Sequence, residues 1–358
     1  MFIGADVQQL REIASLFAAS AEALEQSRKS VKSAIRISAW VGPIAANFRL
    51  SWDSQHSRHL HAAAELLRQQ SVALTAHAAG QSDTSAASNS GIAPYVPFPS
   101  DDSVRVALRE KARVDSPQWG ANSPENVILE FSREGAYSSG VTIRTIVQGD
   151  GSRSHIVYIP GTQDWDNTTN NPFNVNAAAS AAIGWETDVS RVVKEAMALH
   201  GIAFDEPVML AGHSLGGLTA ANLAADAEFR AAYEVKSVVV YGADVSGSHI
   251  PEGIQVTQVN NRGGDPVSMI TGNVNGPMTA VHSLTSIDVF QPNIQPDRGE
   301  HGIIPFIFSD HNSTLNYARF ASQWNVDHPG EWKANNPDFL TDSDATSSVA
   351  RYNAHQTD

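Results

Sequence analysis

Apolar side chains follow a helical period in the first part of the chain. Between residues 6 and 37 they recur at steps of three, four or seven, and a similar series follows Gly42 and Pro43. Such spacing places them on one helix face, and glycine followed by proline is typical of one helix ending and another beginning. The pattern predicts an all-α antiparallel helical hairpin over residues 1–80. The two series are Val7, Leu10, Ile13, Phe17, Leu24, Val31 and Ile35, and Ile44, Phe48, Trp52, Leu60, Ala63, Leu67 and Leu74.

The pattern changes after residues 81–104, which are rich in Ser, Ala, Gly and Pro and are interpreted as a linker. From residue 105 to 358, short apolar runs typical of strands alternate with helical stretches. This alternation predicts a second, α/β domain, with a mostly parallel sheet covered by helices on both faces. The predicted strands are 126–131, 141–148, 155–160, 208–212, 237–243, 254–261 and 283–290, and the predicted helices are 176–199, 214–227 and 313–324.

One of these strand-to-helix junctions reads Gly212-His213-Ser214-Leu215-Gly216. The spacing Gly-x-Ser-x-Gly between a strand and a helix is typical of a nucleophile elbow, a strained turn that exposes the serine. Glycines two residues before and after the serine let the two backbones approach without Cβ clashes. The alternative is a glycine-rich helix start in which Ser214 is a simple N-cap.

A serine nucleophile needs a base to take its proton and an acid that orients the base. In the chain order of such elbows, the acid and then the histidine follow the serine. Asp265 follows the second predicted strand after Ser214 and is the preferred acid, with Asp244 as the alternative. His311, just before the last predicted helix, is the preferred base over His301. A histidine base predicts activity that falls below about pH 6.5.

The developing oxyanion also needs hydrogen-bond donors. One is expected to be the backbone amide of Leu215, the residue after the nucleophile. The other is expected from the loop after the strand 155–160, where Gly161 permits a tight turn and the amide of Thr162 or Gln163 can point inward.

These residues together resemble the α/β-hydrolase superfamily, and most of all its class 3 lipases and related esterases. The resemblance rests on GHSLGG (212–217), PGT (160–162), NRGGDPV (261–267) and His311 with Tyr317 downstream. It implies an α/β-hydrolase fold and ester hydrolysis through an acyl-serine intermediate without a cofactor, phospholipids included among the esters that it allows. Pro160 departs from the basic or small residue that family lipases often carry there. An acyltransferase, or an inactive hydrolase-fold protein with a secretion or interaction role, remains an alternative.

The hairpin resembles the WXG family of small helical proteins exported by type VII secretion. The resemblance rests on Trp40-Val41-Gly42 in the turn and on Ala45, Ala46, Phe48 and Trp52 after it. It implies a helical WXG-type partner chain, or self-association through the hairpin, and export without a cleaved signal peptide; a cytoplasmic location is the alternative. The Tyr-x-x-x-Asp/Glu signal often found after the second helix is absent here, where the chain reads LTAHAAGQSD (74–83).

Composition narrows the function classes. The 358 residues include no cysteine, which excludes disulfides, thiolate metal sites and cysteine nucleophiles. The net charge of -14 makes nucleic acid a poor partner. We see no apolar run long enough to cross a membrane and no basic patch that would bind anionic lipid.

Two groups of polar residues could suggest a metal, but neither is interpreted so. His56 and His59 share a face of the second predicted helix without a third ligand. The stretch DWDNTTNN (164–171) lacks the glycine and the closing glutamate of a calcium loop and is interpreted as a polar access loop.

Overall fold

The structure is a computed structural model of the chain. It divides the chain into two compact units, which are described separately: residues 1–100 with 300–305, and residues 101–299 with 306–358. The residues described are 7–38, 41–53, 57–58, 60–61, 64–65, 67–68, 71–72, 75, 104–114, 120–133, 139–164, 169–182, 184, 186–261, 265, 284–289 and 314–357.

The first unit contains the helices α1 (Val7–Ile37) and α2 (Pro43–Ser51), and described residues up to 75 are also helical. Gly42 precedes α2 with φ 111°, a value that favours glycine, and Pro43 opens the helix as predicted. Four contacts join α1 to the later segment, and the residue numbers fall on α1 while they rise on its partner. They are Lys32–Asp53 (3.6 Å), Arg28–Ser57 (3.0 Å), Glu25–His61 (2.6 Å) and Ala14–Ser71 (2.7 Å).

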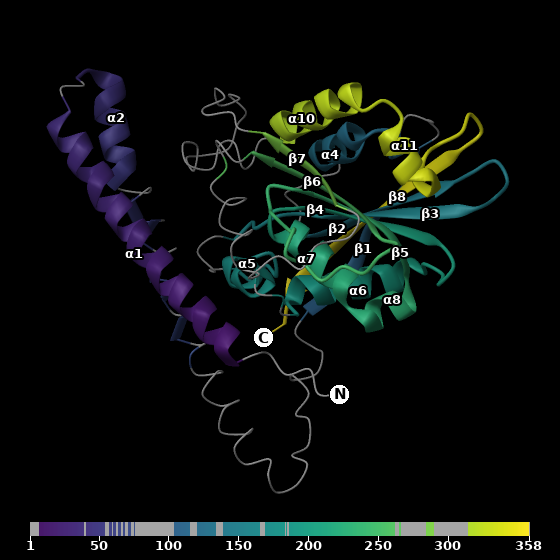
Figure 1. Cartoon of the computed structure of the whole chain (residues 1–358), viewed down its shortest axis with the longest axis horizontal. Coiled ribbons are helices and arrows are strands. Elements are labelled where there is room, and N and C mark those ends of the chain that lie inside the picture. Colours follow the sequence, from purple (N-terminus) through teal and green to yellow (C-terminus); the bar gives the residue numbers. More distant parts are fainter. Residues whose placement is uncertain are drawn as a thin grey trace, which may run out of the picture. The chain divides into compact units, whose positions relative to one another are not determined.

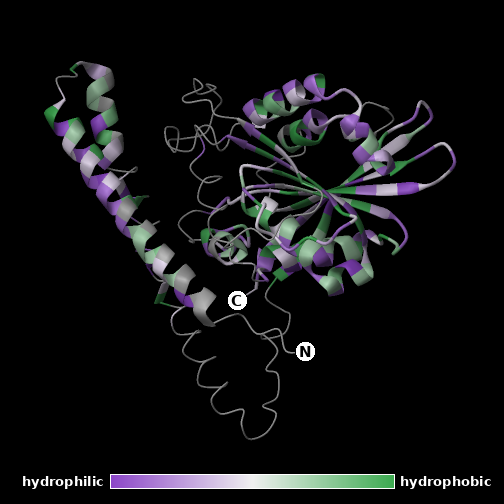
Figure 2. Cartoon of the chain, in the orientation of Figure 1, coloured by the Kyte–Doolittle hydropathy of each residue, from purple (hydrophilic) through white to green (hydrophobic). Residues whose placement is uncertain are grey.

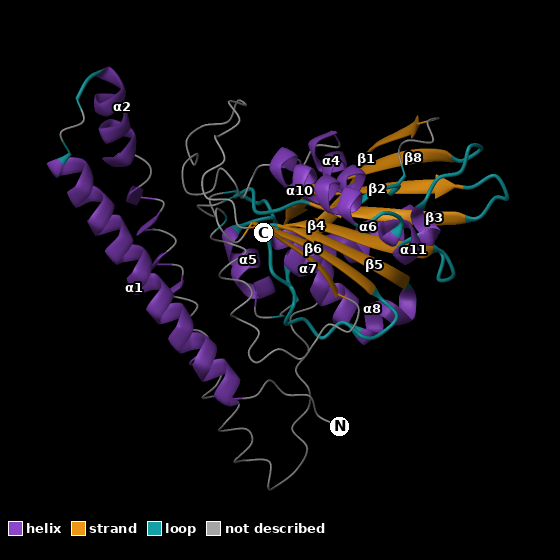
Figure 3. Ribbon diagram, turned by 45° about the horizontal axis from the view of Figure 1, so that its top comes forward, coloured by secondary structure: helices purple, strands orange, loops and turns teal. Residues whose placement is uncertain are grey.

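The second unit is built on one eight-stranded mixed sheet in the order β1-β8-β2-β3-β4-β5-β6-β7 (Figures 1 and 3). The strands from β3 to β7 are parallel to one another, whereas β8 pairs antiparallel with both β1 and β2, and β2 pairs antiparallel with β3. The predicted α/β class with a mostly parallel sheet is therefore confirmed. The strands are β1 (Val104–Val114), β2 (Gly140–Val147), β3 (Arg153–Ile159), β4 (Pro207–His213), β5 (Glu234–Tyr241), β6 (Gln255–Asn261), β7 (Leu284–Val289) and β8 (Thr346–Gln356).

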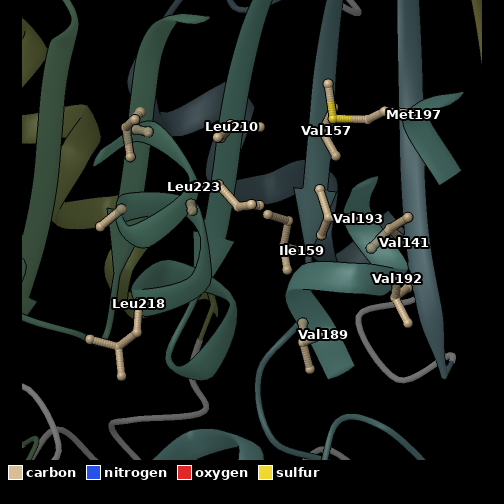
Figure 4. Close-up of a cluster of buried hydrophobic side chains, with 14 of the residues drawn as sticks. Val141, Val157, Ile159, Val189, Val192, Val193, Met197, Leu210, Leu218 and Leu223 are labelled. Carbon is tan, nitrogen blue, oxygen red and sulfur yellow. The ribbon is translucent and has the colours of Figure 1, made fainter. Parts of the chain in front are cut away.

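Helices cover both faces of this sheet, and each face has its own apolar core. On one face lie α5 (Val175–Ala182), α6 (Asp188–His200), α7 (Leu215–Ala225) and α8 (Ala227–Ala232). On the other lie α4 (Pro124–Arg133), α10 (Thr314–Asp327), α11 (Glu331–Asn335) and the short 3-10 helix η3 (Pro337–Phe339). In Figure 4, Val189, Val192, Val193 and Met197 of α6 pack toward the sheet residues Val141, Val157, Ile159 and Leu210. Figure 2 shows the middle of the sheet coloured hydrophobic, as strands buried on both faces require.

The strand predicted at 126–131 is wrong, because these residues belong to α4. Val127, Ile128 and Phe131 are buried at helical spacing against the sheet. The Ser123 hydroxyl accepts the Asn126 amide (3.1 Å), so Ser123-Pro124 is a helix start signal that outweighs the strand propensity of the apolar residues.

Other predicted elements need smaller corrections. The helix predicted at 176–199 is two helices, separated at Gly184 with φ 79° and restarted by a capping box of Thr187 and Ser190. Strands β1 and β8 were not predicted, and Val104, the last residue of the predicted linker, begins β1. Among the described residues, every helix is too short or too polar to cross a bilayer.

A series of side-chain hydrogen bonds, which we call the hydrogen-bond chain, connects α6 with strands β2, β3 and β8. The Thr145 hydroxyl lies between His155 Nδ1 (3.0 Å) and His200 Nε2 (2.8 Å), while His155 Nε2 contacts Glu206 (2.8 Å) and His200 Nδ1 contacts the Tyr352 hydroxyl (2.9 Å). A carboxylate only accepts, so neutral His155 donates to Glu206 and accepts from Thr145. Thr145 then accepts from His200, which accepts from Tyr352. This arrangement of donors and acceptors requires both histidines to be neutral, and protonation of either one would reverse a hydrogen bond.

We expect this chain to make the folded state sensitive to acid. Burial, and then the electrostatic effects of nearby His155, Lys111 and Arg153, lower the pKa of His200 to about 4, and burial lowers the pKa of His155. The unfolded chain binds these protons below about pH 6.5 and the folded chain does not. Stability should be full above that pH and fall as the pH drops toward 4. The loss from His200 should be about 1–2 kcal/mol, allowing for the solvent that reaches this half-buried ring.

Urea unfolding from pH 7.5 to 4.5 measures this loss separately from any loss of activity. His200→Gln should flatten the dependence, whereas His355→Gln, at an exposed histidine of β8, should leave it unchanged. Equal slopes for the wild-type chain and His200→Gln would contradict the assignment.

Candidate functional site

Ser214 occupies a strained turn between β4 and α7. Its backbone has φ 53° and ψ -120°, and it is the one non-glycine residue with positive φ in the described part of the chain. Its side chain forms no capping hydrogen bond with α7, although it stands at the N-cap position. The Ser214 amide donates to the Tyr241 carbonyl (3.0 Å) at the end of β5. The strain, which costs about 1–3 kcal/mol at such positions, and the missing cap favour the nucleophile elbow over a simple helix start.

The glycines around Ser214 are required by close backbone contacts. A Cβ at Gly212 would collide with the Gly216 carbonyl, and a Cβ at Gly216 would collide with the Ile159 carbonyl at the end of β3. Gly217, which the motif spacing does not require, lies against the side chain of Val240. The turn therefore has no room for side chains at the two positions that the motif specifies.

The predicted oxyanion loop lies directly beside this turn. A Cβ at Gly161 would be 2.8 Å from His213 Nδ1 and 3.1 Å from Ser214 Cβ.

The Gln163 amide donates to the Phe173 carbonyl (2.7 Å), so it is already engaged, and Thr162 becomes the candidate donor in this loop. The Leu215 amide belongs to the first turn of α7, whose amides have no acceptor within the helix.

Asp164 and Thr169 are hydrogen-bonded on either side of residues 165–168, the part of the predicted access loop that lies outside the described residues. Asp164 Oδ2 accepts from the amide (2.8 Å) and the hydroxyl (2.6 Å) of Thr169, and the Asp164 carbonyl accepts from the Val175 amide (3.0 Å). These bonds give its carboxylate a structural role at the edge of the stretch 164–171.

Asp265 is fully buried just beyond β6 and is hydrogen-bonded to α10. Tyr317 donates its hydroxyl to Asp265 Oδ2, and the Asp265 amide donates to the Asn261 carbonyl (2.9 Å). Burial, together with the charge of Asp265, holds the pKa of Tyr317 well above its usual value, so this tyrosine remains a donor.

A row of aromatic rings connects this acid with the elbow. The Tyr317 ring lies 5.2 Å from the Tyr241 ring, which stacks on His213 at 4.5 Å, next to Ser214. The structure therefore brings Asp265 and Ser214 to the same edge of the sheet, beyond β6 and β4, with Tyr241 at the end of the intervening strand β5. Tyr241 has no role in the sequence-based prediction of the site. Its position could have indicated a role, because Tyr241 is the last residue of the strand that follows Ser214 in the chain. In the sheet it pairs with His213.

Asp244 is buried beyond β5, where its Oδ1 accepts from the amide (2.9 Å) and the hydroxyl (2.6 Å) of Ser246. These bonds shape the turn that leaves the strand. The Asp265 carboxylate accepts from Tyr317 of α10, which is distant in the sequence, whereas the two bonds from Ser246 to Asp244 are local.

The histidine predictions fall outside the described residues: His311, His301, and also His56 and His59 in the first unit. The nearest described residue after His311 is Thr314, the first residue of α10, whose hydroxyl lies 3.4 Å from the Tyr241 hydroxyl. Helix α10 thus begins beside the aromatic row.

Comparison with known proteins does not assign the chain to a family. No protein-family model, no curated protein and no solved structure matches the chain.

Proposed function

We propose that this protein is a serine hydrolase that cleaves carboxylic esters through an acyl-serine intermediate, on an α/β-hydrolase fold. The observation that carries the proposal is the backbone of Ser214, which holds positive φ at a strand-to-helix turn without using its hydroxyl as a cap. Such strain persists where the surrounding structure imposes it, and it concentrates at catalytic positions.

In the proposed reaction, Ser214 Oγ attacks the ester carbonyl and its proton passes to His311. The amides of Thr162 and Leu215 donate to the oxyanion that forms. Collapse of this intermediate expels the alcohol, which takes the proton from His311 and leaves an acyl-serine. Water, deprotonated by His311, then releases the carboxylic acid and restores Ser214. Asp265 orients the histidine throughout.

The preference for His311 over His301 rests on how few residues separate His311 from the described residue Thr314. His311 stands three residues before Thr314, and three residues span at most about 11 Å. Thr314 contacts Tyr241, whose ring stacks on the residue next to Ser214. His301 stands thirteen positions before Thr314, so its position is far less constrained by the chain.

Labelling with a fluorophosphonate probe tests the proposal. We expect the native full chain to react, peptide mapping to find the adduct on Ser214, and Ser214→Ala to abolish it. Ser343→Ala, at an exposed serine in a turn, is the matched control and should label like the wild-type chain. An adduct elsewhere, or persistent labelling of Ser214→Ala, would remove the elbow assignment.

A panel of nitrophenyl esters of different acyl length, with and without an added alcohol, defines the reaction. Release of free acid supports hydrolysis, and acyl transfer to the alcohol identifies an acyltransferase. No turnover on any ester, together with no labelling, would leave an interaction role for the fold.

The proposal extends to the first unit as a WXG-type helical hairpin. Its support is the antiparallel order of the four contacts between α1 and the later segment, and the turn formed by Gly42 and Pro43. Export by a type VII route, and a helical partner or self-association, are implications of this assignment.

A further inference from the structure

One end of the first unit has a charge opposite to that of the chain as a whole. Residues 26–52, from the last part of α1 through α2, contain five basic and no acidic residues, in a chain with a net charge of -14. The basic residues are Arg28, Lys29, Lys32, Arg36 and Arg49. The expectation that the chain has no basic patch is therefore wrong, because the overall acidity concealed a local run.

Three of these side chains lie together on the helix. The spacing of Lys29, Lys32 and Arg36 places them within one face of α1, and all three are exposed. Two carboxylates lie just outside this stretch: Asp53 is 3.6 Å from Lys32, and Glu25 pairs with Arg28. Counting both, the five basic residues leave a local net charge of +3 (5 minus 2).

Large apolar side chains are exposed at the same end. Ile37 ends α1, Val41 lies in the turn and Leu50 lies near the end of α2, and they are 77%, 83% and 70% exposed. The contact Lys32–Asp53 shows that α2 folds back along α1, so Leu50 is level with the last turns of α1. The end of α1 beside α2 in Figure 2 accordingly carries both hydrophobic and hydrophilic residues.

Hydrogen bonds join α1 to the opposite segment next to these basic residues. Glu25 of α1 accepts from Arg28 (2.8 Å) and contacts His61 of the opposite segment (2.6 Å), and these bonds, that from Arg28 first, lower its pKa to about 2. Arg28 also donates to Ser57 (3.0 Å). The bonds hold the two segments together where the basic residues begin.

We propose that residues 26–52, which we call the tip, bind the surface of a bilayer that contains anionic phospholipid. The basic face of α1 contacts the head groups, and Ile37, Val41 and Leu50 enter the interface between head groups and acyl chains. The rest of the chain is acidic overall, although β1 also carries four basic residues and one acidic residue. The tip is distinguished because its basic residues lie at the same end as three largely exposed apolar side chains. This binding does not depend on the proposed ester hydrolysis.

Flotation of the full chain with vesicles tests the proposal. We expect binding to vesicles of phosphatidylglycerol and phosphatidylcholine, little binding to phosphatidylcholine alone, and loss of most binding in 1 M NaCl, where the Debye length is about 3 Å. The variant Lys29→Gln/Lys32→Gln/Arg36→Gln should bind about 100-fold more weakly, since each basic residue near such a surface contributes about fivefold. Ile37→Ser/Val41→Ser/Leu50→Ser should bind more weakly even at low salt.

The matched control removes three exposed basic residues from the second unit, as Arg109→Gln/Arg319→Gln/Lys333→Gln. It should lose at most a small part of the binding, through the greater overall negative charge, and far less than the triple variant of the tip. Circular dichroism should show the same helix content in all variants. Equal binding to both vesicle types, or an equal loss in the control, would overturn the proposal. So would an apolar triple variant that changes a dimer to a monomer in sedimentation and leaves vesicle binding unchanged, because the apolar residues would then serve a second copy of the chain.

Discussion

Ser214→Gly is expected to stabilise the second unit while it removes ester hydrolysis. The Ser214 backbone, at φ 53° and ψ -120°, is unfavourable for a residue with a Cβ and accessible to glycine. Relief of this strain should raise the free energy of unfolding by about 1–2 kcal/mol relative to Ser214→Ala, which keeps the Cβ. Turnover should fall by about 10⁶-fold in both variants, as when the nucleophile of other triad hydrolases is removed.

Urea unfolding and nitrophenyl ester turnover measure the two effects on the same preparations. Ser343→Gly is the matched control, because Ser343 is exposed and the added chain freedom should leave its stability unchanged or slightly lower. If Ser214→Gly were no more stable than Ser214→Ala, the strain at the turn would have no energetic consequence, and the main support for the proposed function would be lost.

The strained turn at Ser214 was predictable because the requirement for its glycines is local. A side chain at Gly212 would collide with the Gly216 backbone, and one at Gly216 would collide with the Ile159 backbone. The spacing of the motif reflects this close approach of the two backbones. The parallel strands from β3 to β7 were also predictable, since each contains a short apolar run in the sequence. Local signals of this kind do not depend on where the rest of the chain lies.

What the sequence did not reveal depends on contacts between distant segments. Thr162 is preferred over Gln163 as the candidate oxyanion donor because the Gln163 amide donates to the Phe173 carbonyl, which is distant in the sequence. Strand β8 fills a position between β1 and β2 that only the complete sheet defines. The role of Tyr317 likewise requires α10 to pack over β6, which places its hydroxyl on Asp265.

The helix α4 shows the same limit and leads to the prediction with the largest expected effect on stability. With 126–131 taken as a strand, Glu130 had no assigned partner. In the helix it faces the sheet and forms a salt bridge with Arg144 of β2, and both side chains are buried. Arg144 also donates to Ser347 of β8 (3.0 Å), so the guanidinium joins α4 to two neighbouring strands.

Glu130→Leu is therefore expected to lower the free energy of unfolding by about 3–5 kcal/mol, because it leaves the Arg144 guanidinium buried without its carboxylate. Arg144→Met should have a similar effect for the opposite charge. The double variant Glu130→Leu/Arg144→Met should recover most of the loss, since replacing both members of a buried pair with apolar side chains removes the desolvation penalty along with the attraction. Urea unfolding of the four chains gives the coupling between the two positions.

The matched control is Glu110→Leu, which breaks the pair between Arg351 of β8 and Glu110 of β1 (2.8 Å), where Glu110 is about half exposed. Its effect should stay below about 1 kcal/mol, as for other pairs at the surface. The contrast matters more than either value, because the two pairs have the same chemistry and differ in burial. A Glu130→Leu loss as small as that of Glu110→Leu, or a double variant less stable than both single variants, would show that the Arg144 charge finds enough solvent or other partners in the core.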